Sequence, residues 1–408
     1  MRDKATTESR LARRRHRHCW RTLHAVLGIS AGLVFTIIGL TGSLLAFWPE
    51  LDVWMHPALI QVSAHADQEK ALRSLDDIVA AARSVIPADG QPYALVYPRF
   101  PDSGFVVTYS RPAPDPKQLE WHQVFIDPYT ALVTGKRLQF DMERPWRGSL
   151  FDFILRLHYT LALGAQGATL VGIIALALMV LLASGIVLWW PASTHISSAF
   201  TIKRGGSHQR FLYDLHKTVG FYASVLLMIA LFSGLYLVFP DYVKALIGIF
   251  STTGTTPHLT SAPSHEQRPI GFDEVAAIAD ETFPDGRFQW IFFPQGANGV
   301  YKIVKKAPLE RTDILPARAL WIDQYSGQVL HTHDPAHYTT GQTFMHWLFP
   351  LHSGEAFGWP GRFMILCLGL VPGALFITGL IRWRQNRRGR ERGRRHEEKA
   401  LFAVSKFT

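Results

Sequence analysis

Cysteine is almost absent from the chain, which has two cysteines among 408 residues. Cys19 precedes the first long apolar run and Cys367 lies within the last, so the two are poorly placed for a disulfide. No CxxC pair occurs, which argues against a thiolate metal site, and no CxxCH occurs, which excludes a covalently attached c-type haem. The short loops between apolar runs also lack a GxGxxG fingerprint and are too short to hold a flavin domain.

Charged residues are scarce within four apolar runs, at residues 23–48, 168–190, 215–239 and 362–383. Each run is long enough to cross a bilayer, which takes about 20 residues. The net charge is +10, and its arginines gather before the first run, between the second and third, and after the fourth. Positive charge marks the cytoplasmic ends of membrane spans, so both termini are predicted inside. We therefore predict the lipid bilayer, and no nucleic acid, as a partner.

These features predict an α-helical membrane protein, a four-span bundle with two small α+β modules outside the cytoplasm. The first apolar run is too long for a cleavable signal peptide. In chain order the predicted parts are a basic cytoplasmic tail at residues 1–21, span 1 at 22–49, a first outside module at 50–147, a re-entrant segment with span 2 at 148–190, a cytoplasmic loop at 191–212, span 3 at 213–240, a second outside module at 241–343, a re-entrant segment with span 4 at 344–384, and a basic cytoplasmic tail at 385–408. We expect the first tail to be disordered or to lie on the inner leaflet.

The two outside segments show the same succession of patterns. Helical spacing at residues 75–85 is followed by strand-like alternation at 93–97 and 104–109, and a further strand is predicted to begin at 124–127. In the second segment a helix is predicted at 272–279 and strands at 288–293, 300–304 and 319–323. Asp127 and Asp323 begin matching turns. Each segment therefore reads as a small α+β module.

A tandem repeat organises the whole chain. His158 is followed by Gly164, Gly167, Gly185 and Trp189, and His352 is followed at the same offsets by Gly358, Gly361, Gly379 and Trp383. Likewise, Leu23-His24 leads to Gly28 and Thr41-Gly42, as Leu215-His216 leads to Gly220 and Ser233-Gly234. Four blocks that keep one offset to within a few residues indicate a repeat of about 190–200 residues. Two spans in each half give the repeats parallel topology around an axis along the membrane normal.

The repeat supplies two classes of histidine at the ends of membrane spans. His24 and His216 begin outward-going spans, and His158 and His352 begin inward-going spans. Two-fold symmetry brings together the equivalent histidines of the two halves, His24 with His216 and His158 with His352. We therefore predict two pairs, one near each membrane face. Each pair would hold a non-covalent haem b by its iron, with one axial imidazole from each half. Such haems have no open position and carry electrons.

Other interpretations of these histidines remain open. A single intramembrane histidine is more often a polar packing residue, and the four together carry the haem hypothesis. A zinc site lacks accompanying carboxylates or thiols, and a proton relay usually adds intramembrane acids, which the apolar cores of spans 1 to 3 lack. The glycines of span 1 either allow close helix packing or leave room for a flat macrocycle, and these two interpretations are compatible.

Two further groups of residues belong to this hypothesis. His346 is an alternative outer ligand, but Asp152 occupies its matching position in the first half, so symmetry favours His352. Arg156, Lys217 and Arg362 lie near the ligand positions, where they would either meet haem propionates or act as interfacial anchors.

The motifs resemble the PepSY-associated transmembrane family, also described as PiuB-type iron-regulated membrane proteins. The resemblance covers nearly the whole chain and is carried by the histidine and glycine blocks named above, together with Leu351-His352-Ser353-Gly354-Glu355 and Thr378-Gly379. It implies PepSY-like periplasmic modules, location in the bacterial inner membrane, and similarity to di-haem siderophore reductases. The implied activity is reduction of a ferric siderophore in the periplasm, which releases Fe(II).

Two other functions remain open at this point. One is a membrane-anchored PepSY regulatory or binding protein, in which the histidines only pack. The other is an electron relay to a periplasmic protein. The electron donor is predicted to be a diffusible cytoplasmic reductant, a quinol or another protein.

Overall fold

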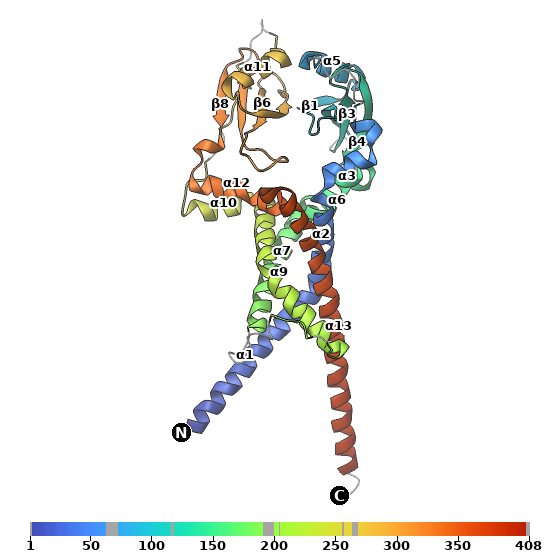
Figure 1. Cartoon of the computed structure of the whole chain (residues 1–408), viewed down its shortest axis with the longest axis vertical. Coiled ribbons are helices and arrows are strands. Elements are labelled where there is room, and N and C mark those ends of the chain that lie inside the picture. The colour runs from blue at the N-terminus through green and yellow to red at the C-terminus, as the bar shows by residue number, and fades with distance from the viewer. Residues whose placement is uncertain are drawn as a thin grey trace. The chain divides into compact units, whose positions relative to one another are not determined.

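The computed structural model describes residues 2–62, 72–115, 118–190, 200–203, 205–254, 257–262 and 268–404 (Figure 1). The described chain forms two compact units. A membrane-type helical unit comprises residues 1–44, 158–239 and 363–408, and a sheet unit comprises residues 45–157 and 240–362. The helical unit is assembled from three separated stretches of the chain, and the sheet unit from two, one in each half.

The helical unit is built from long apolar helices. They are α1 (Arg2–Ser30), α2 (Gly32–Leu45), α7 (Gly164–Trp189), α9 (His208–Val238) and most of α13 (Gly358–Val404). Three helices are long and apolar enough to cross a membrane, and the bent pair α1 and α2 makes a fourth if it counts as one span. The first basic tail is therefore helical from Arg2, and the last is helical as far as Val404. The four-span count itself stays a prediction.

A bend of 55° separates α1 from α2. Ser30, at the end of α1, donates its hydroxyl to Val26 O at 2.8 Å, and Gly32 begins α2. A serine bonded back to its own helix and a neighbouring glycine are both known causes of a kink. A Cβ at Gly32 would lie 2.6 Å from the Phe376 ring, so the bend lets α13 approach closely.

The core of the helical unit is made of small and aliphatic side chains. Its most buried members include Leu178 of α7 and Leu227 of α9, which are 1% and 3% exposed. Gly39 of α2 lies directly against Gly369 of α13, and Ser43 donates to Leu366 O at 2.8 Å. Neighbouring helices thus fill the space beside these glycines, as close packing of membrane helices requires. The packing interpretation is confirmed at Gly32 and Gly39, and the macrocycle interpretation of the glycine stripe stays a prediction.

The sheet unit contains one antiparallel sheet of eight strands, in the order β4-β3-β2-β1-β5-β6-β7-β8. Its strands are β1 (Gln91–Val96), β2 (Phe105–Pro112), β3 (Leu119–Ile126), β4 (Val133–Asp141), β5 (Arg287–Phe292), β6 (Val300–Lys306), β7 (Ala319–Asp323) and β8 (Val329–His333). β1 pairs with β5, and Leu95 lies opposite Ile291. Each of these two residues is the fifth of its strand, so equivalent positions of the two halves meet at this seam. Two modules were predicted, and they share one sheet.

Two helices cover this sheet, α5 (Leu75–Val85) and α11 (Phe272–Thr282). Ser74 caps α5 by accepting Asp77 N at 3.0 Å, and the helix ends before Pro87. The cluster between helices and strands includes Ile78, Val275 and Leu320, each 0% exposed. Lys305 reaches the end of α11 and donates to Phe283 O at 2.6 Å. These contacts make the helices and strands one core.

Matching turns follow β3 and β7. Asp127 Oδ1 accepts Tyr129 N at 2.8 Å, and Asp323 Oδ1 accepts Tyr325 N at 2.9 Å. The prediction of equivalent aspartate turns is confirmed. The strand predicted to begin at residues 124–127 instead ends there, because β3 starts at Leu119.

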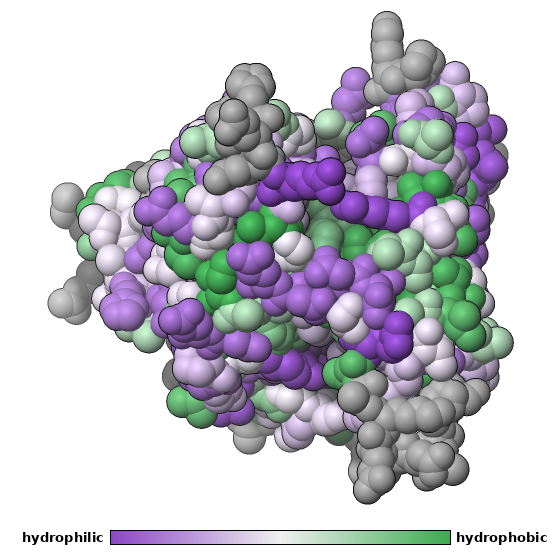
Figure 2. Space-filling view, turned by 90° about the horizontal axis from the view of Figure 1, so that it is seen from above, coloured by the Kyte–Doolittle hydropathy of each residue, from purple (hydrophilic) through white to green (hydrophobic). Residues whose placement is uncertain are grey.

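Shorter helices complete the sheet unit. They are α3 (Trp48–Met55), α4 (Pro57–Ile60), η1 (Pro145–Arg147), most of α6 (Leu150–Thr160), α10 (Pro240–Gly248), η3 (Pro335–His337), α12 (Thr340–Ser353) and η4 (Glu355–Phe357). Seen from above, the surface is mostly polar, with apolar residues in separate groups (Figure 2). The helical unit differs, since α7 and α9 expose many large apolar side chains such as Ile173 and Val225. That contrast is the one expected between a water-facing and a lipid-facing unit.

The predicted breaks before spans 2 and 4 are confirmed. α6 stops at Thr160, and Leu161 and Ala162 take positive φ angles of 51° and 58° before α7 begins. In the second half, Gly354 and Gly358 have φ angles of 82° and 61° between α12 and α13. Left-handed backbone ends a helix abruptly, and glycine adopts it without strain.

Candidate functional site

Three of the predicted histidines lie in the helical unit, and each contacts a hydroxyl of another helix. His216 Nδ1 lies 2.8 Å from Thr378 Oγ1 of α13. His24 Nδ1 lies 2.9 Å from Ser184 Oγ of α7. His158 Nδ1, at the end of α6, lies 3.1 Å from Thr41 Oγ1 of α2. One arrangement thus occurs three times in this unit.

A glycine follows each of these hydroxyl residues and makes room for the imidazole. A Cβ would lie 3.2 Å from His24 Cε1 if placed on Gly185, and 3.3 Å from His216 Cε1 if placed on Gly379. At Gly42 it would lie 3.0 Å from His158 Cε1. The Ser/Thr-Gly pair is therefore a receptor for a histidine ring that comes from a different helix.

The hydroxyls and nearby carbonyls fix the protonation of the rings. Thr378 Oγ1 donates its own hydrogen to Ala374 O at 2.7 Å, which leaves its oxygen to accept from His216 Nδ1. His158 Nδ1 also lies 2.9 Å from Ile38 O, which can only accept. We therefore assign the hydrogen to Nδ1 in both rings. The lone pair then lies on Nε2, the nitrogen that remains to bind a metal.

The same argument applies to His24. Its Nδ1 lies 3.2 Å from Leu181 O, and Ser184 Oγ donates to that same carbonyl at 2.7 Å. Leu181 O and Ser184 Oγ therefore both act as acceptors, and His24 Nδ1 must be the donor to them. His24 thus shares the tautomer of His216 and His158, with Nε2 free of a proton.

His24 and His216 come together, as the repeat predicts. Their ring centroids are 6.2 Å apart and their planes are inclined by 86°. Two imidazole nitrogens bonded at about 2.0 Å to opposite sides of one metal place the ring centroids roughly 6 Å apart. The pair has the spacing and the tautomers that two axial ligands need.

The outer pair is divided between the units. His158 belongs to the helical unit, whereas His352 belongs to the sheet unit. Their pairing stays a prediction. His346, the alternative ligand, lies on α12 with Nε2 3.6 Å from Glu310 Oε1 and its ring 5.8 Å from that of Tyr338. Glu310, whose side chain is 2% exposed, is a partner that sequence analysis did not find.

Charged residues near the ligands are engaged within the protein. Lys217 lies 3.2 Å from Asp214, and Arg362 binds Glu50 through two hydrogen bonds of 2.7 and 2.6 Å. Arg156 lies over the Phe140 ring at 4.1 Å. Propionate binding and interfacial anchoring by these residues both stay predictions.

Within the described ranges, no group of three or more His, Cys, Asp or Glu side chains is placed to hold a metal ion. An axial pair supplies only two ligands, so this observation concerns zinc-type sites.

Ser184 and the cross-helix role of Thr41 were missed by sequence analysis. We associated Thr41-Gly42 with His24 because both belong to the first apolar run. The structure instead places Thr41 against His158. The available signal was the Ser or Thr that precedes Gly42, Gly185 and Gly379 alike.

Comparison with protein families agrees with the observed fold. The family model described as the PepSY-associated TM region matches residues 21–386. The chain belongs to the PepSY-associated transmembrane family. The matched region includes all five candidate histidines, from His24 to His352. A comparison with curated proteins found no match. This PepSY-associated protein is thus a membrane protein with apolar helices and an antiparallel sheet.

Proposed function

We propose that this protein is a di-haem oxidoreductase of the bacterial inner membrane. It would pass electrons from the cytoplasmic side to a ferric siderophore in the periplasm. The observation that carries the proposal is the His24–His216 pair, in which two imidazoles 6.2 Å apart both have Nδ1 turned to a hydroxyl. A packing histidine needs no such fixed tautomer, whereas a metal ligand does.

The residues that would hold the cofactor have distinct tasks. His24 and His216 would supply the two axial nitrogens of the inner haem b. Ser184 and Thr378 keep Nδ1 protonated and hold the plane of each ring. A haem iron with two imidazole ligands has no open position and serves one-electron transfer.

The outer haem would be held by His158 and His352. Support comes from Thr41, which gives His158 the same tautomer that Thr378 gives His216. The apolar helices between the two levels would exclude water, and their exposed apolar side chains would face lipid. Each electron delivered outside would convert one Fe(III) to Fe(II) in the chelate. Ferric siderophore as substrate rests on the family resemblance.

The test is an absorption spectrum of the protein purified from haem-replete cells. We expect a b-type spectrum with two haems per chain, and reoxidation of the reduced protein by a ferric siderophore without any partner. His216→Ala should remove about half of the haem. His18→Ala, which removes an exposed histidine from the same helix as His24, should leave it intact.

Three outcomes oppose the proposal in different ways. A colourless preparation overturns it and leaves a membrane-anchored PepSY regulatory protein. Full haem content in His216→Ala shows that the inner pair is wrong. Reoxidation that requires a periplasmic protein replaces the siderophore reductase with an electron relay.

A further inference from the structure

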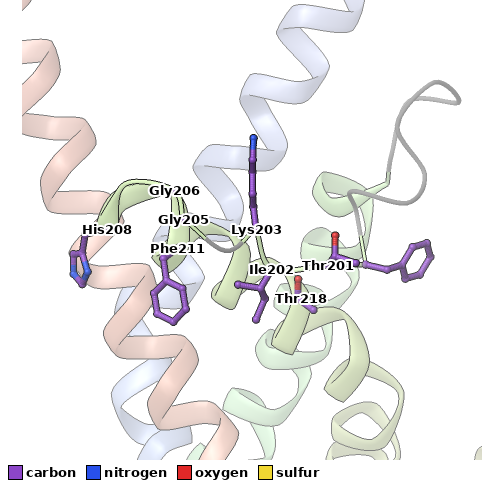
Figure 3. A pocket seen from close by; sticks show the side chains of 9 residues that line it. Thr201, Ile202, Lys203, Gly205, Gly206, His208, Phe211 and Thr218 are labelled. Atoms are coloured by element: carbon purple, nitrogen blue, oxygen red, sulfur yellow. The ribbon is translucent and has the colours of Figure 1, made fainter.

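A pocket of about 870 Å³ lies beside the first turns of α9 (Figure 3). One wall is the chain at residues 200–203, 205 and 206, and the other is formed by His208, Phe211 and Thr218 of α9. α9 is one of the helices apolar enough to cross a membrane. It also carries His216, two residues before Thr218 of the pocket lining.

Buried contacts build this pocket. Asp214, which is 0% exposed, accepts Lys203 N at 3.2 Å and so ties the first wall to α9. The same carboxylate binds Arg210 Nε at 3.0 Å and Lys217 Nζ at 3.2 Å. Asp214 thus ties this wall to α9, and Arg210 and Lys217 share its single negative charge.

An aromatic cluster fixes the Phe200 end of the wall. Trp189, at the end of α7, stacks on Phe221 of α9 with ring centroids 3.8 Å apart. Phe200 meets both rings edge-on, at 5.1 and 5.3 Å. Phe200 is therefore held between two membrane helices, and its place in the pocket wall is set by packing.

Thr218 brings an unsatisfied polar group to the pocket. The residue is 8% exposed, and its Oγ1 has no hydrogen-bond partner among the described residues. Figure 3 shows its side chain directed toward Thr201 and Ile202 across the pocket. A buried hydroxyl without a partner is unusual and calls for a ligand or another explanation.

The walls select the chemistry of that ligand. Phe200, Ile202 and Phe211 offer apolar and aromatic surface, and Thr218 offers one hydroxyl that can donate or accept. A flat ring with an oxygen substituent satisfies both. A phosphate-bearing ligand fits less well, because Lys203 is the only lysine or arginine among the described lining residues, and Arg210 and Lys217 lie outside that lining and are bound to Asp214.

We propose that this pocket binds the head group of a membrane quinol, the electron donor of the reaction proposed above. The inference rests on that proposed function. Residues two positions apart on a helix point about 200° apart, so a ring at Thr218 approaches α9 from the side opposite His216 and does not compete with its ligation. Quinols dissolve in the bilayer and reach α9 from lipid.

The donor step balances with the acceptor already named. One quinol loses two electrons and two protons and becomes a quinone as both ring O–H bonds break. The electrons leave one at a time through the His216 level and reduce two Fe(III) chelates to Fe(II). The protons pass to water at the open side of the pocket, where His208 is exposed.

Photolabelling of the haem-containing protein tests the site without relying on turnover. An azido-quinone is bound, irradiated, and its attachment mapped by mass spectrometry, with unlabelled quinone as competitor. We expect label within residues 200–218. Thr218→Val should lower labelling by about fivefold to tenfold, the effect of one hydrogen bond, and Thr218→Ser should restore it.

Ser224→Ala is the matched control, since Ser224 is buried on α9 and donates to Phe221 O of its own helix at 2.7 Å. It should label as the parent does. In parallel, rapid mixing with a short-chain quinol should reduce the parent faster than Thr218→Val, while dithionite reduces both alike.

The outcomes separate this inference from the proposed function. Label outside the pocket, or unchanged labelling in Thr218→Val, overturns the quinol site even if the protein contains haem and reduces a siderophore. Reduction by a nicotinamide and not by quinol also overturns it. Thr218-dependent labelling of a colourless protein upholds the quinone site and overturns the haem function.

Discussion

Asp76 and Asp273 each cap the helix that carries the other. Asp76 Oδ1 accepts Phe272 N at the start of α11, and Asp273 Oδ1 accepts Leu75 N at the start of α5, both at 2.8 Å. The second oxygen of each carboxylate accepts the other aspartate's N–H, at 3.3 and 3.5 Å. The exchange ties the two halves of the sheet unit at their helices, as the β1–β5 pairing does at their strands.

Asp76→Ala should therefore destabilise α11, which is distant in sequence, by about 0.5–2 kcal/mol. Asp273→Ala should do the same to α5. Thermal unfolding measures the effect, and hydrogen exchange assigns it to the helix. Asp89→Ala removes only a solvent-exposed pair with Arg111 and should cost less than about 1 kcal/mol. If amide protection in the Asp76→Ala variant were lost first in α5, the reciprocal capping of the two helices would be contradicted.

Removal of the hydroxyl behind a ligand tests the tautomer argument. Thr378→Val and Ser184→Ala leave His216 and His24 in place but remove the acceptors of their Nδ1 hydrogens. We expect haem affinity to fall about 10-fold to 100-fold, together with a shift in reduction potential. Thr36→Val is the control, because Thr36 donates to Gly32 O of its own helix, α2, at 2.9 Å. Equal haem retention in all three variants would show that Thr378 and Ser184 do not position the two histidines.

Gly379→Ala and Gly389→Ala, both on α13, should change the free energy of unfolding in opposite directions. Replacing a helical glycine with alanine normally stabilises by about 0.4–1 kcal/mol. At Gly389 nothing lies within 4 Å of the added methyl, so that gain should be retained. At Gly379 the methyl would lie 3.3 Å from His216 Cε1 and displace the ring. Haem titration should show weaker binding only for Gly379→Ala, and equal binding in both would contradict the receptor role of the glycine.

Acid should weaken the sheet unit through Asp141. Burial alone would raise the pKa of this carboxyl, but the N–H groups of Arg144 and Glu143 and the Arg144 guanidinium outweigh burial and hold the pKa below its ordinary value. A depressed pKa stabilises the fold above the unfolded pKa of about 3.9 and loses that effect as pH falls through the folded value. The melting temperature of Asp141→Asn should thus lie below that of the parent at pH 7, and the gap should narrow below about pH 4. A gap that is constant with pH would exclude this linkage.

The local spacing of apolar residues predicted many of the helices and strands, but it could not predict which distant strands pair. The spacing of apolar residues predicted a helix at residues 75–85, which is α5, because its buried face repeats with helical period. β4 was not predicted, since Val133–Asp141 is largely polar and contains Gly135. The pairing of Leu95 with Ile291 joins strands far apart in the chain, and no local pattern encodes it.

The candidate site divides in the same way. Symmetry between the repeats predicted that His24 would meet His216, and their rings are 6.2 Å apart. Periodicity could not say which helix would face each ring, because that depends on how the helices pack. Ser184 and the partnership of Thr41 with His158 became visible only in the folded unit.

The seam between β1 and β5 bears on how such a chain could arise. Equivalent residues face one another there, as they do at the two-fold axis of a homodimer. A half-length ancestor would present β1 as a bare edge strand, open to pairing with the same strand of a second copy. Gene duplication and fusion would turn that concentration-dependent association into a permanent one. Each half could then diverge in sequence while it stayed paired with the other half.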